Sequence, residues 1–205
     1  MPVFTKDERR ILFIHVPKAA GSSIEKQFRT SGWKMDYYNV CANPYEPALQ
    51  HLTYRELSEM IADLDDIPSF SVVRNPFKRM VSEWRWQVNI MRNTDVDFPN
   101  FVRRVQVSLK TSKTYWDNHW RPQTDFISDK VDDVIKMEQL DESFERFAIE
   151  QNLGFTSLPK SNKSKTRFGA FPKLSVNDET IDRIREIYRD DFERLEYSKD
   201  MPAVS

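Results

Sequence analysis

The residues best suited to chemistry lie in the stretch from residue 11 to residue 23, ILFIHVPKAAGSS. Its apolar start predicts a buried strand, and the small residues and two serines that follow predict a tight turn into a helix N-terminus. Such a turn brings unpaired backbone N–H groups and the positive end of a helix dipole to one point. Lys18 adds a full positive charge there. The stretch therefore predicts a site for a phosphate-like or sulfate-like anion.

The order of residues in this turn differs from that of the common ATP- and GTP-binding loop. In that loop the lysine follows the glycines and directly precedes a serine or threonine. Here Lys18 precedes Gly21. A strand-to-helix turn with a solvated lysine would explain the stretch equally well, so the turn alone leaves the function open.

A second stretch, SFSVVRNPFKRMVSEWRW from residue 69 to residue 86, repeats the strand-to-helix pattern. Its first five residues predict a buried strand, Asn75 is a good helix N-cap, and Pro76 suits the first helical position. Arg74 then lies at the C-terminal end of the strand, which is the edge where open α/β sheets bind their ligands. The expected helix carries further lysines and arginines, so this second site is also suited to an anion.

The two stretches together resemble the sulfotransferases. HVPKAAGSS, around Lys18, is similar to the 5′-phosphosulfate loop of that family, and VVRNPFKRMVSEW, with Arg74 and Ser82, is similar to its 3′-phosphate motif. Further along, HWRPQTDFI and IYRDDFERLEY resemble the branch that contains the carbohydrate (family 2-like) sulfotransferases and their bacterial relatives. The resemblance extends over nearly the whole chain.

The resemblance implies transfer of a sulfuryl group from 3′-phosphoadenosine 5′-phosphosulfate (PAPS), with release of 3′-phosphoadenosine 5′-phosphate (PAP). The implied acceptor is a hydroxyl, or an amine, of a carbohydrate or other small molecule, reached by in-line transfer without a metal. The implied fold is α/β: a single P-loop-like domain over residues 1–205, with a central, mostly parallel sheet flanked by helices.

The resemblance also assigns the residues that contact the donor. Lys18 would stabilise the charge that develops as the sulfuryl group leaves, and Arg74 and Ser82 would bind the 3′-phosphate. A late basic stretch, KSNKSKTR, lies where the family has a mobile loop that covers the cofactor. The full set expected to contact PAPS is Pro17, Lys18, Ala19, Ala20, Gly21, Ser22, Ser23, Arg74, Ser82, Asn162, Lys163, Ser164 and Arg167.

Three residues compete for the role of general base. His51, in QHLTYREL, matches the place where glycan uronyl sulfotransferases carry a histidine base, and an imidazole accepts protons readily at neutral pH. Glu25 lies one turn into the first helix, where other sulfotransferases use a glutamate, and His119 lies in the loop-like YWDNHWRPQ. We expect His51 to be the base and His119 to shape the wall of the site. His15, on the first strand, is expected to be an interior histidine.

Outside the motifs, spacing predicts further helices and their buried sides. Thr53 and Glu56 have the spacing of a capping box, and a last helix is expected from Asp178 to about Leu195. Helical spacing makes Trp84 a core residue. Trp120, in the loop-like run, is instead expected to contact the ligand.

Length and charge limit the class of protein. A chain of 205 residues can bury a substantial core. A net charge of −1 argues against a surface adapted as a whole to nucleic acid or to an anionic membrane. No stretch approaches the roughly 20 apolar residues of a membrane span, and the charged first residues leave no room for a signal peptide, so we expect a cytoplasmic protein. The oligomeric state stays open.

Two other classes of function stay open at this point. A P-loop-like nucleotide kinase or hydrolase would need the GxxxxGK[ST] loop and an acidic residue at the end of a second strand to hold magnesium, and neither is evident. Magnesium-independent turnover would separate that class from a sulfotransferase. A non-catalytic module that binds a nucleotide or a sulfated glycan would keep the same fold and motifs.

Overall fold

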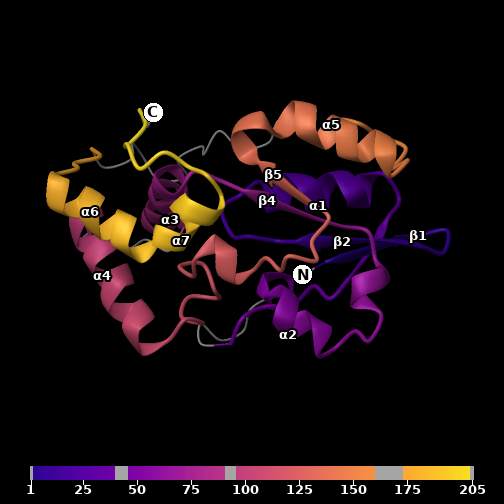
Figure 1. The fold of residues 1–205 in the computed structure, drawn as a ribbon, viewed down its shortest axis with the longest axis horizontal. Helices are drawn as coiled ribbons and strands as arrows, with labels where there is room; N and C mark the ends of the chain where they lie inside the picture. The colour runs from indigo at the N-terminus through magenta and orange to yellow at the C-terminus, as the bar shows by residue number, and fades with distance from the viewer. Residues whose placement is uncertain (1, 40–45, 91–95, 160–172, 204–205) are drawn as a thin grey trace.

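Within the part of the chain that the structure describes, five strands form one sheet in the order β3-β1-β2-β4-β5. The structure, a computed structural model, describes residues 2–39, 46–90, 96–159 and 173–203 (Figure 1). The strands are β1 (Val3–Lys6), β2 (Arg9–Ile14), β3 (Lys34–Asp36), β4 (Ser69–Val73) and β5 (Asp133–Lys136). β4 pairs in parallel with β2 and with β5, whereas β1 is antiparallel to both of its neighbours. The expected α/β fold with mostly parallel central strands is confirmed.

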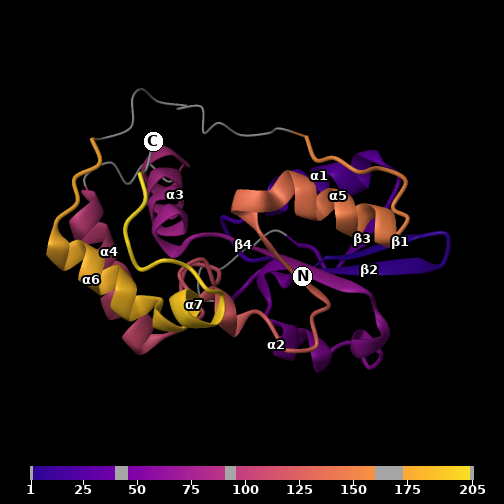
Figure 2. The same cartoon turned by 45° about the horizontal axis from the view of Figure 1, so that its top comes forward.

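Helices cover the sheet and extend beyond one end of it. They are α1 (Gly21–Thr30), α2 (Tyr54–Ser58), α3 (Pro76–Ile90), α4 (Phe98–Thr111), α5 (Leu140–Glu150), α6 (Asp178–Ile187) and α7 (Arg189–Arg194). Figures 1 and 2 show α1 and α5 on one side of the sheet and α2 on the other, while α3, α4, α6 and α7 group together beside it. Each group has its own hydrophobic cluster.

The two central strands explain why both sequence motifs meet. Residues 11–14 of β2 are at most 1% exposed, and every residue of β4 is buried, because both faces of these strands are covered. Phe13 of β2 pairs with Phe70 of β4 in a parallel register. Adjacent parallel strands end at the same edge of a sheet, so the turn after β2 and the turn after β4 lie side by side.

Several local predictions are confirmed by the structure. Asn75 caps α3 by accepting hydrogen bonds from the N–H groups of Phe77 and Lys78. Thr53 and Glu56 form the expected capping box at the start of α2. Trp84 is a buried core residue. These features depend on neighbours within one helix, which is why spacing predicts them.

Other predictions are wrong, and long-range packing is the reason. Trp120 is fully buried against Phe101 and Tyr115 and therefore does not contact a ligand. The predicted last helix is two helices, because Tyr188 leaves the helical conformation between α6 and α7. By contrast, the first helix begins at Gly21, within one residue of the two serines expected to open it, which agrees with the prediction.

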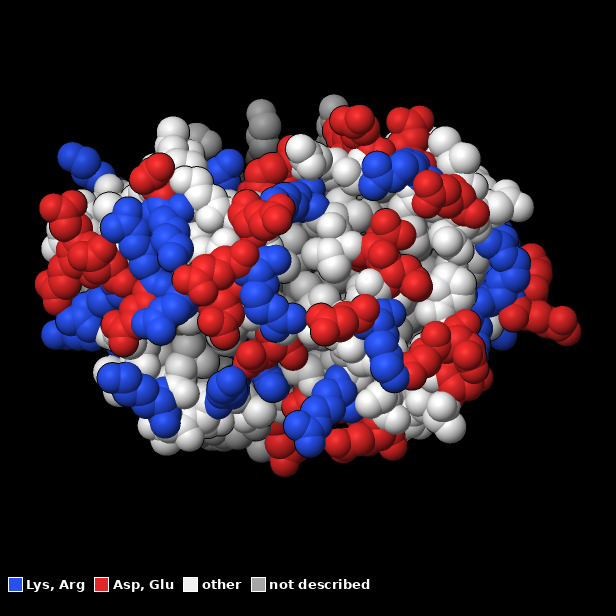
Figure 3. Space-filling view, in the orientation of Figure 1, with Lys and Arg blue, Asp and Glu red and all other residues white. Residues whose placement is uncertain are grey.

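The surface carries charges of both signs. Figure 3 shows lysines and arginines intermingled with aspartates and glutamates over the face seen there, without an extended area of one sign. Among the described residues, no helix has both the length and the apolar composition needed to cross a bilayer.

Candidate active site

A cavity of about 680 Å³ lies where the turns after β2 and β4 meet, and both sequence motifs line it. One face of α3 forms a wall, because Lys78, Ser82 and Arg85 recur at intervals of three or four residues. The residues expected to contact the donor that line the cavity are Pro17, Lys18, Ala20, Gly21, Ser22, Ser23, Arg74 and Ser82. Ala19 is fully buried beside them. Asn162, Lys163, Ser164 and Arg167 lie outside the described residues, so their assignment stays a prediction.

The turn after β2 has a backbone suited to binding an anion. Lys18 and Ala20 adopt left-handed conformations, with φ of 68° and 65°. Such conformations cost non-glycine residues about 1–3 kcal/mol each and persist where the surroundings fix them. Ala20 is the N-cap of α1 and has no side-chain group with which to cap it. The Ser23 N–H donates to the Ala20 carbonyl at 2.9 Å, so within the first turn of α1 the N–H groups of Gly21 and Ser22 are the ones suited to a ligand in the cavity.

Lys18 is held among charged and aromatic groups. Its Nζ lies 5.1 Å from the centroid of the Trp86 ring, and its carbonyl accepts a hydrogen bond of 3.3 Å from Arg74 Nη1. Burial lowers the pKa of Lys18, and the positive charge of Arg74 adds to this effect, whereas Glu83 opposes it. An anion bound beside Lys18 would relieve both the desolvation and the repulsion, so the site favours an anionic ligand.

Arg79 is a buried arginine that connects three parts of the site. From the sequence it counted only as one of several basic residues of the expected helix. Arg79 is 1% exposed, and its Nε donates to the carbonyl of Pro17 at 3.0 Å. Its Nη2 donates to the carbonyl of His119 at 2.9 Å, and its guanidinium lies 5.5 Å from the centroid of the Tyr188 ring. One side chain thus fixes the turn after β2, the segment around His119 and the start of α7.

The backbone of Arg74 is fixed by Gln123, from the HWRPQ motif. Arg74 N–H donates to Gln123 Oε1 at 2.9 Å, and Gln123 Nε2 donates to the Arg74 carbonyl at 2.8 Å. The next backbone N–H, of Asn75, donates to Glu138 Oε1 at 3.0 Å. The strand end that presents the Arg74 side chain is therefore held on two sides.

All three histidines of the chain line the cavity and form a row. The ring centroids of His15 and His51 are 4.8 Å apart, and those of His51 and His119 are 5.0 Å apart, both edge to face. Each histidine has Nδ1 against a carboxylate oxygen: His15 against Glu25 at 2.7 Å, His51 against Asp117 at 2.7 Å, and His119 against Glu83 at 2.9 Å. His15 is buried as expected, yet it also forms part of the cavity wall.

Burial and hydrogen bonding determine the protonation states of His51 and Asp117. Burial lowers the pKa of His51 to about 3, although the hydrogen bond to Asp117 acts in the opposite direction, so the ring is neutral at pH 7. Burial would raise the pKa of Asp117, but hydrogen bonding, first of all to His51, outweighs burial and lowers it. An ionised carboxylate only accepts hydrogen bonds, so the proton of His51 lies on Nδ1 and Nε2 keeps a lone pair.

The outer carboxylates are ionised as well. The pKa of Glu83 falls to about 2, because the neighbouring His119 and the charge of Lys18 outweigh the effect of burial. The pKa of Glu25 is also lowered, since the interaction with His15 outweighs its desolvation. Glu25 is therefore anionic and already engaged with His15, which makes it a less available base than a neutral imidazole.

His51, Asp117 and His119 could in principle hold a metal ion, since their ligand atoms lie within 4.8 Å of one another. A zinc ion binds nitrogen and oxygen at about 2.0–2.2 Å. It would have to displace the proton that His51 shares with Asp117. The hydrogen bond between these two residues accounts for their short separation, so we assign no metal to the site.

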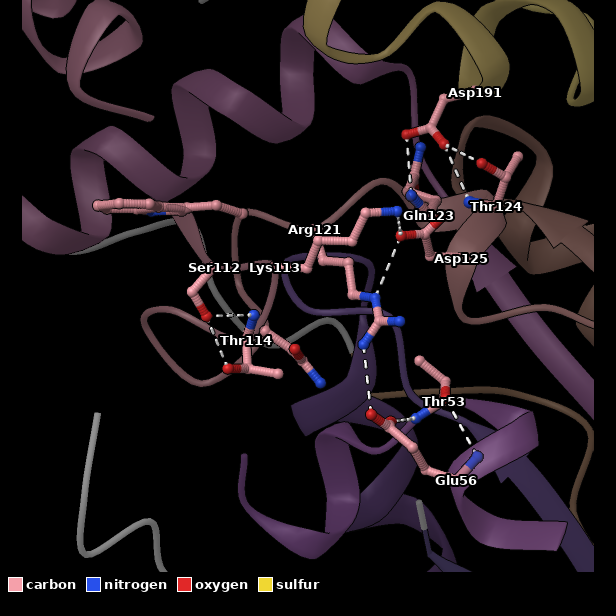
Figure 4. A network of polar contacts seen from close by, with 12 residues as sticks. Thr53, Glu56, Ser112, Lys113, Thr114, Arg121, Gln123, Thr124, Asp125 and Asp191 are labelled. Carbon is pink, nitrogen blue, oxygen red and sulfur yellow. Dashed lines mark hydrogen bonds and ion pairs between the residues drawn. The ribbon is translucent and has the colours of Figure 1, made fainter. Parts of the chain in front are cut away.

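The segment that carries Asp117 and His119 is anchored at its far end (Figure 4). Arg121 joins Asp125, at 3.2 Å, to Glu56 of α2, at 3.4 Å. The N–H groups of Gln123 and Thr124 donate to Asp191 of α7 at 3.0 and 2.9 Å. The segment is thus fixed both to α2, the helix that follows His51, and to α7.

Sequence reasoning missed the carboxylates that hold the histidines. The motifs gave neither Glu83 nor Asp117 a role in the site. The adjacent polar pair Asp117 and Asn118, directly before His119 in a loop-like run, is the signal that could have drawn attention to this segment. Its partner, His51, lies 66 positions earlier, and no local spacing relates the two.

Comparison with known proteins gives one match. The model of a family described as "Sulfotransferase family" matches residues 1–198. The matched range contains the turns after β2 and β4, the three histidines and their carboxylates. No curated protein and no solved structure matches the chain.

Residue 21 must be glycine, because the imidazole of His15 occupies the space that a Cβ would need. A Cβ at residue 21 would lie 2.0 Å from His15 Nε2 and 2.3 Å from Cε1. We expect Gly21→Ala to destabilise the protein by about 1–3 kcal/mol, as overpacking usually does, and to weaken anion binding in the cavity. Combining it with His15→Ala should cost less than the sum of the single changes by about 1–2 kcal/mol, measured by urea unfolding.

Gly154→Ala is the matched control for that cycle. A Cβ at residue 154 meets nothing within 4 Å, and its cost comes from a φ of 81°. Its effect should therefore add to that of His15→Ala. Simple additivity of Gly21→Ala with His15→Ala would contradict the contact.

The low pKa of His51 predicts a pH-dependent stability. In the unfolded chain this histidine binds a proton as the pH falls through about 6.5, whereas the folded protein resists protonation until about pH 3. Its contribution is therefore complete above pH 6.5 and is lost as the pH falls toward 3, by up to about 1.4 kcal/mol per pH unit. Urea unfolding at pH 7, 6 and 5 should show a smaller loss for His51→Gln than for wild type. Parallel losses would contradict the assignment.

Proposed function

Because the chain belongs to the sulfotransferase family and so transfers sulfuryl groups, we propose that its donor is PAPS and that its acceptor is a hydroxyl of a carbohydrate-type molecule. The observation that carries the proposal is the single cavity shared by Lys18, Arg74 and Ser82. PAPS has a 5′-phosphosulfate and a separate 3′-phosphate. It needs two anion-binding positions in one cavity, and two such turns meet here.

The donor is proposed to bind with its two anionic groups on different elements. The 5′-phosphosulfate would accept hydrogen bonds from the first N–H groups of α1 and from Lys18. The 3′-phosphate would lie along the flank of α3, between the guanidinium of Arg74 and the hydroxyl of Ser82. Ser82 lies two turns into α3, and its place in the cavity lining supports this contact. Lys78 and Arg85, on the same face, add positive charge.

The proposed reaction is an in-line displacement at sulfur. A bond forms between the acceptor oxygen and sulfur while the bond between sulfur and the bridging phosphate oxygen breaks. Negative charge builds on the bridging oxygen, where Lys18 and the N–H groups of α1 would stabilise it by about 3–4 kcal/mol for a well-placed donor. The acceptor proton passes to a general base, for which His51 is the leading candidate because it is neutral and keeps a lone pair on Nε2.

The part of the cavity near His51 suits an uncharged acceptor. The lysines and arginines among the described lining residues lie on the turns after β2 and β4 and on α3. The wall around His51 carries Tyr38 and Gln50, which offer an aromatic ring and an amide. Aromatic rings pack against sugar faces, and amides hydrogen-bond hydroxyls. A neutral sugar or polyol fits this wall better than an anionic glycan.

The geometry does not favour a nucleotide kinase or hydrolase. Such an enzyme would hold magnesium through an acidic residue after the second strand, whereas β4 is followed by Arg74 and Asn75. Glu138, the carboxylate beside them, is engaged by the N–H of Asn75 and by the hydroxyl of Tyr197. Turnover without magnesium separates the two classes.

Metal-free calorimetric titration with PAP, AMP and ATP tests the choice of donor. We expect PAP to bind most tightly, because only PAP places a phosphate between Arg74 and Ser82. Arg74→Ala should weaken PAP binding by about 10- to 100-fold, as expected when a hydrogen-bonded charge pair is lost, and should leave AMP binding nearly unchanged. Arg55→Ala, at an exposed position of α2, is the control. Equal affinities for PAP and AMP would contradict the proposal.

Replacing each candidate base separates binding from chemistry. His51→Gln should leave PAP affinity within about twofold and lower the rate of PAP release from PAPS, with neutral sugars as acceptors, by about 10²- to 10⁴-fold. Glu25→Gln and His119→Gln are matched substitutions in the neighbouring pairs and should cost less. A larger loss in either of them, or normal turnover in His51→Gln, would move the role of the base elsewhere.

A further inference from the structure

We propose that Asp117 is the positioning residue of the base: it holds the proton of His51 on Nδ1 and so leaves Nε2 to accept the proton of the acceptor hydroxyl. This inference rests on the proposed function. Asp117 contacts the imidazole and no reacting atom, so it acts through His51.

Two consecutive side chains clamp the turn that presents His51. Asp117 Oδ2 lies 2.7 Å from His51 Nδ1, and its Oδ1 accepts a hydrogen bond of 2.6 Å from the N–H of Ala48. Asn118, which is fully buried, donates from Nδ2 to the His51 carbonyl at 2.8 Å. The ring, the carbonyl and the start of the short helical turn Leu49–His51 are therefore fixed from one segment.

The backbone of that segment is strained. Trp116, Asp117 and Asn118 have φ of 54°, 57° and 61°, so three consecutive non-glycine residues are left-handed. This conformation is unfavourable for L-residues, more so for tryptophan than for aspartate and asparagine. Strain of this kind persists only where the surroundings fix it, and it concentrates at functional sites. Here the left-handed turn directs two successive side chains to the residue 48–51 turn.

The other two carboxylate pairs are less suited to the role. His15 Nε2 lies against the backbone of Gly21, where an added Cβ would come within 2.0 Å. Glu83 also accepts a hydrogen bond from Gln87 and interacts with the charge of Lys18. It therefore contributes to the turn after β2 as well as to His119. Asp117 and His51 have side chains only 17% and 10% exposed, which shields their hydrogen bond from water.

Asp117→Asn keeps the shape of the side chain and exchanges the donor and the acceptor in the hydrogen bond with His51. The amide oxygen can still accept from the Ala48 N–H, which leaves the NH₂ group facing His51 Nδ1. An NH₂ group only donates, so the proton of His51 must move to Nε2, where it blocks acceptance of the substrate proton. In Ser-His-Asp triads the same change keeps the geometry and lowers turnover about 10⁴-fold through the wrong tautomer.

The test reads the tautomer directly by long-range ¹H–¹⁵N NMR of the full chain labelled in its three histidines. His51→Gln identifies the His51 signals by their loss. At pH 7 we expect wild-type His51 to be protonated on Nδ1 and Asp117→Asn to be protonated on Nε2. Asp63→Asn, in an exposed pair with Arg10, should match wild type. This measurement needs no acceptor.

Turnover and binding complete the design. Asp117→Asn should lower the rate of PAP release from PAPS by about 10²- to 10⁴-fold, with the KM for PAPS within about twofold. A wild-type His51 protonated on Nε2, an unchanged tautomer in Asp117→Asn, or a change confined to KM would overturn the inference. The wild-type spectrum decides the first point even if the variant does not fold. Failure of wild type to bind PAP would instead overturn the proposed function, so the two failures are distinguishable.

Discussion

The site depends on the buried guanidinium of Arg79. A buried charge is tolerated only where hydrogen bonds and opposite charges satisfy it. Arg79 meets part of this requirement by donating from Nε and Nη2 to the carbonyls of Pro17 and His119, two backbone points about 100 residues apart in sequence. Its buried Nη1 has no hydrogen-bond partner among the described residues. The charge of Arg79 also counteracts the rise that burial causes in the pKa of Asp191, whose carboxylate in turn holds Gln123 and Thr124. One residue of α3 therefore fixes three parts of the site relative to one another: the turn after β2, the segment around His119, and α7.

This arrangement gives the cavity two chemically different parts. One part carries backbone N–H groups and fixed positive charges, which suit the anionic ends of a nucleotide donor. The other carries a row of imidazoles, each backed by a carboxylate. The proposed reaction uses both, because charge would be stabilised on the leaving phosphate while a proton leaves the acceptor. The strained backbones at Lys18, Ala20 and residues 116–118 lie in these two parts of the site, which indicates that their conformations serve function.

What the sequence could predict follows from the distance between interacting residues. Lys18 and Arg74 follow strands whose composition is distinctive, and adjacent parallel strands then bring their turns together. β1 was missed because its return turn uses Asp7 and Glu8, with φ of 47° and 65°, without the glycine or asparagine that usually marks such a turn. Asp117 was missed because only the folded chain brings it to His51, and Trp120 was misjudged because its loop-like segment lies inside the helical cluster.

The most direct test of the account is a crystal structure of the protein with PAP bound. The account predicts 3′-phosphate oxygens at about 3 Å from the Arg74 guanidinium and the Ser82 hydroxyl. It also predicts the 5′-phosphate at the N–H groups that open α1, next to Lys18, with His51 Nε2 facing the space beyond it. A 3′-phosphate bound away from Arg74 and Ser82, or a 5′-phosphate away from the start of α1, would contradict the account.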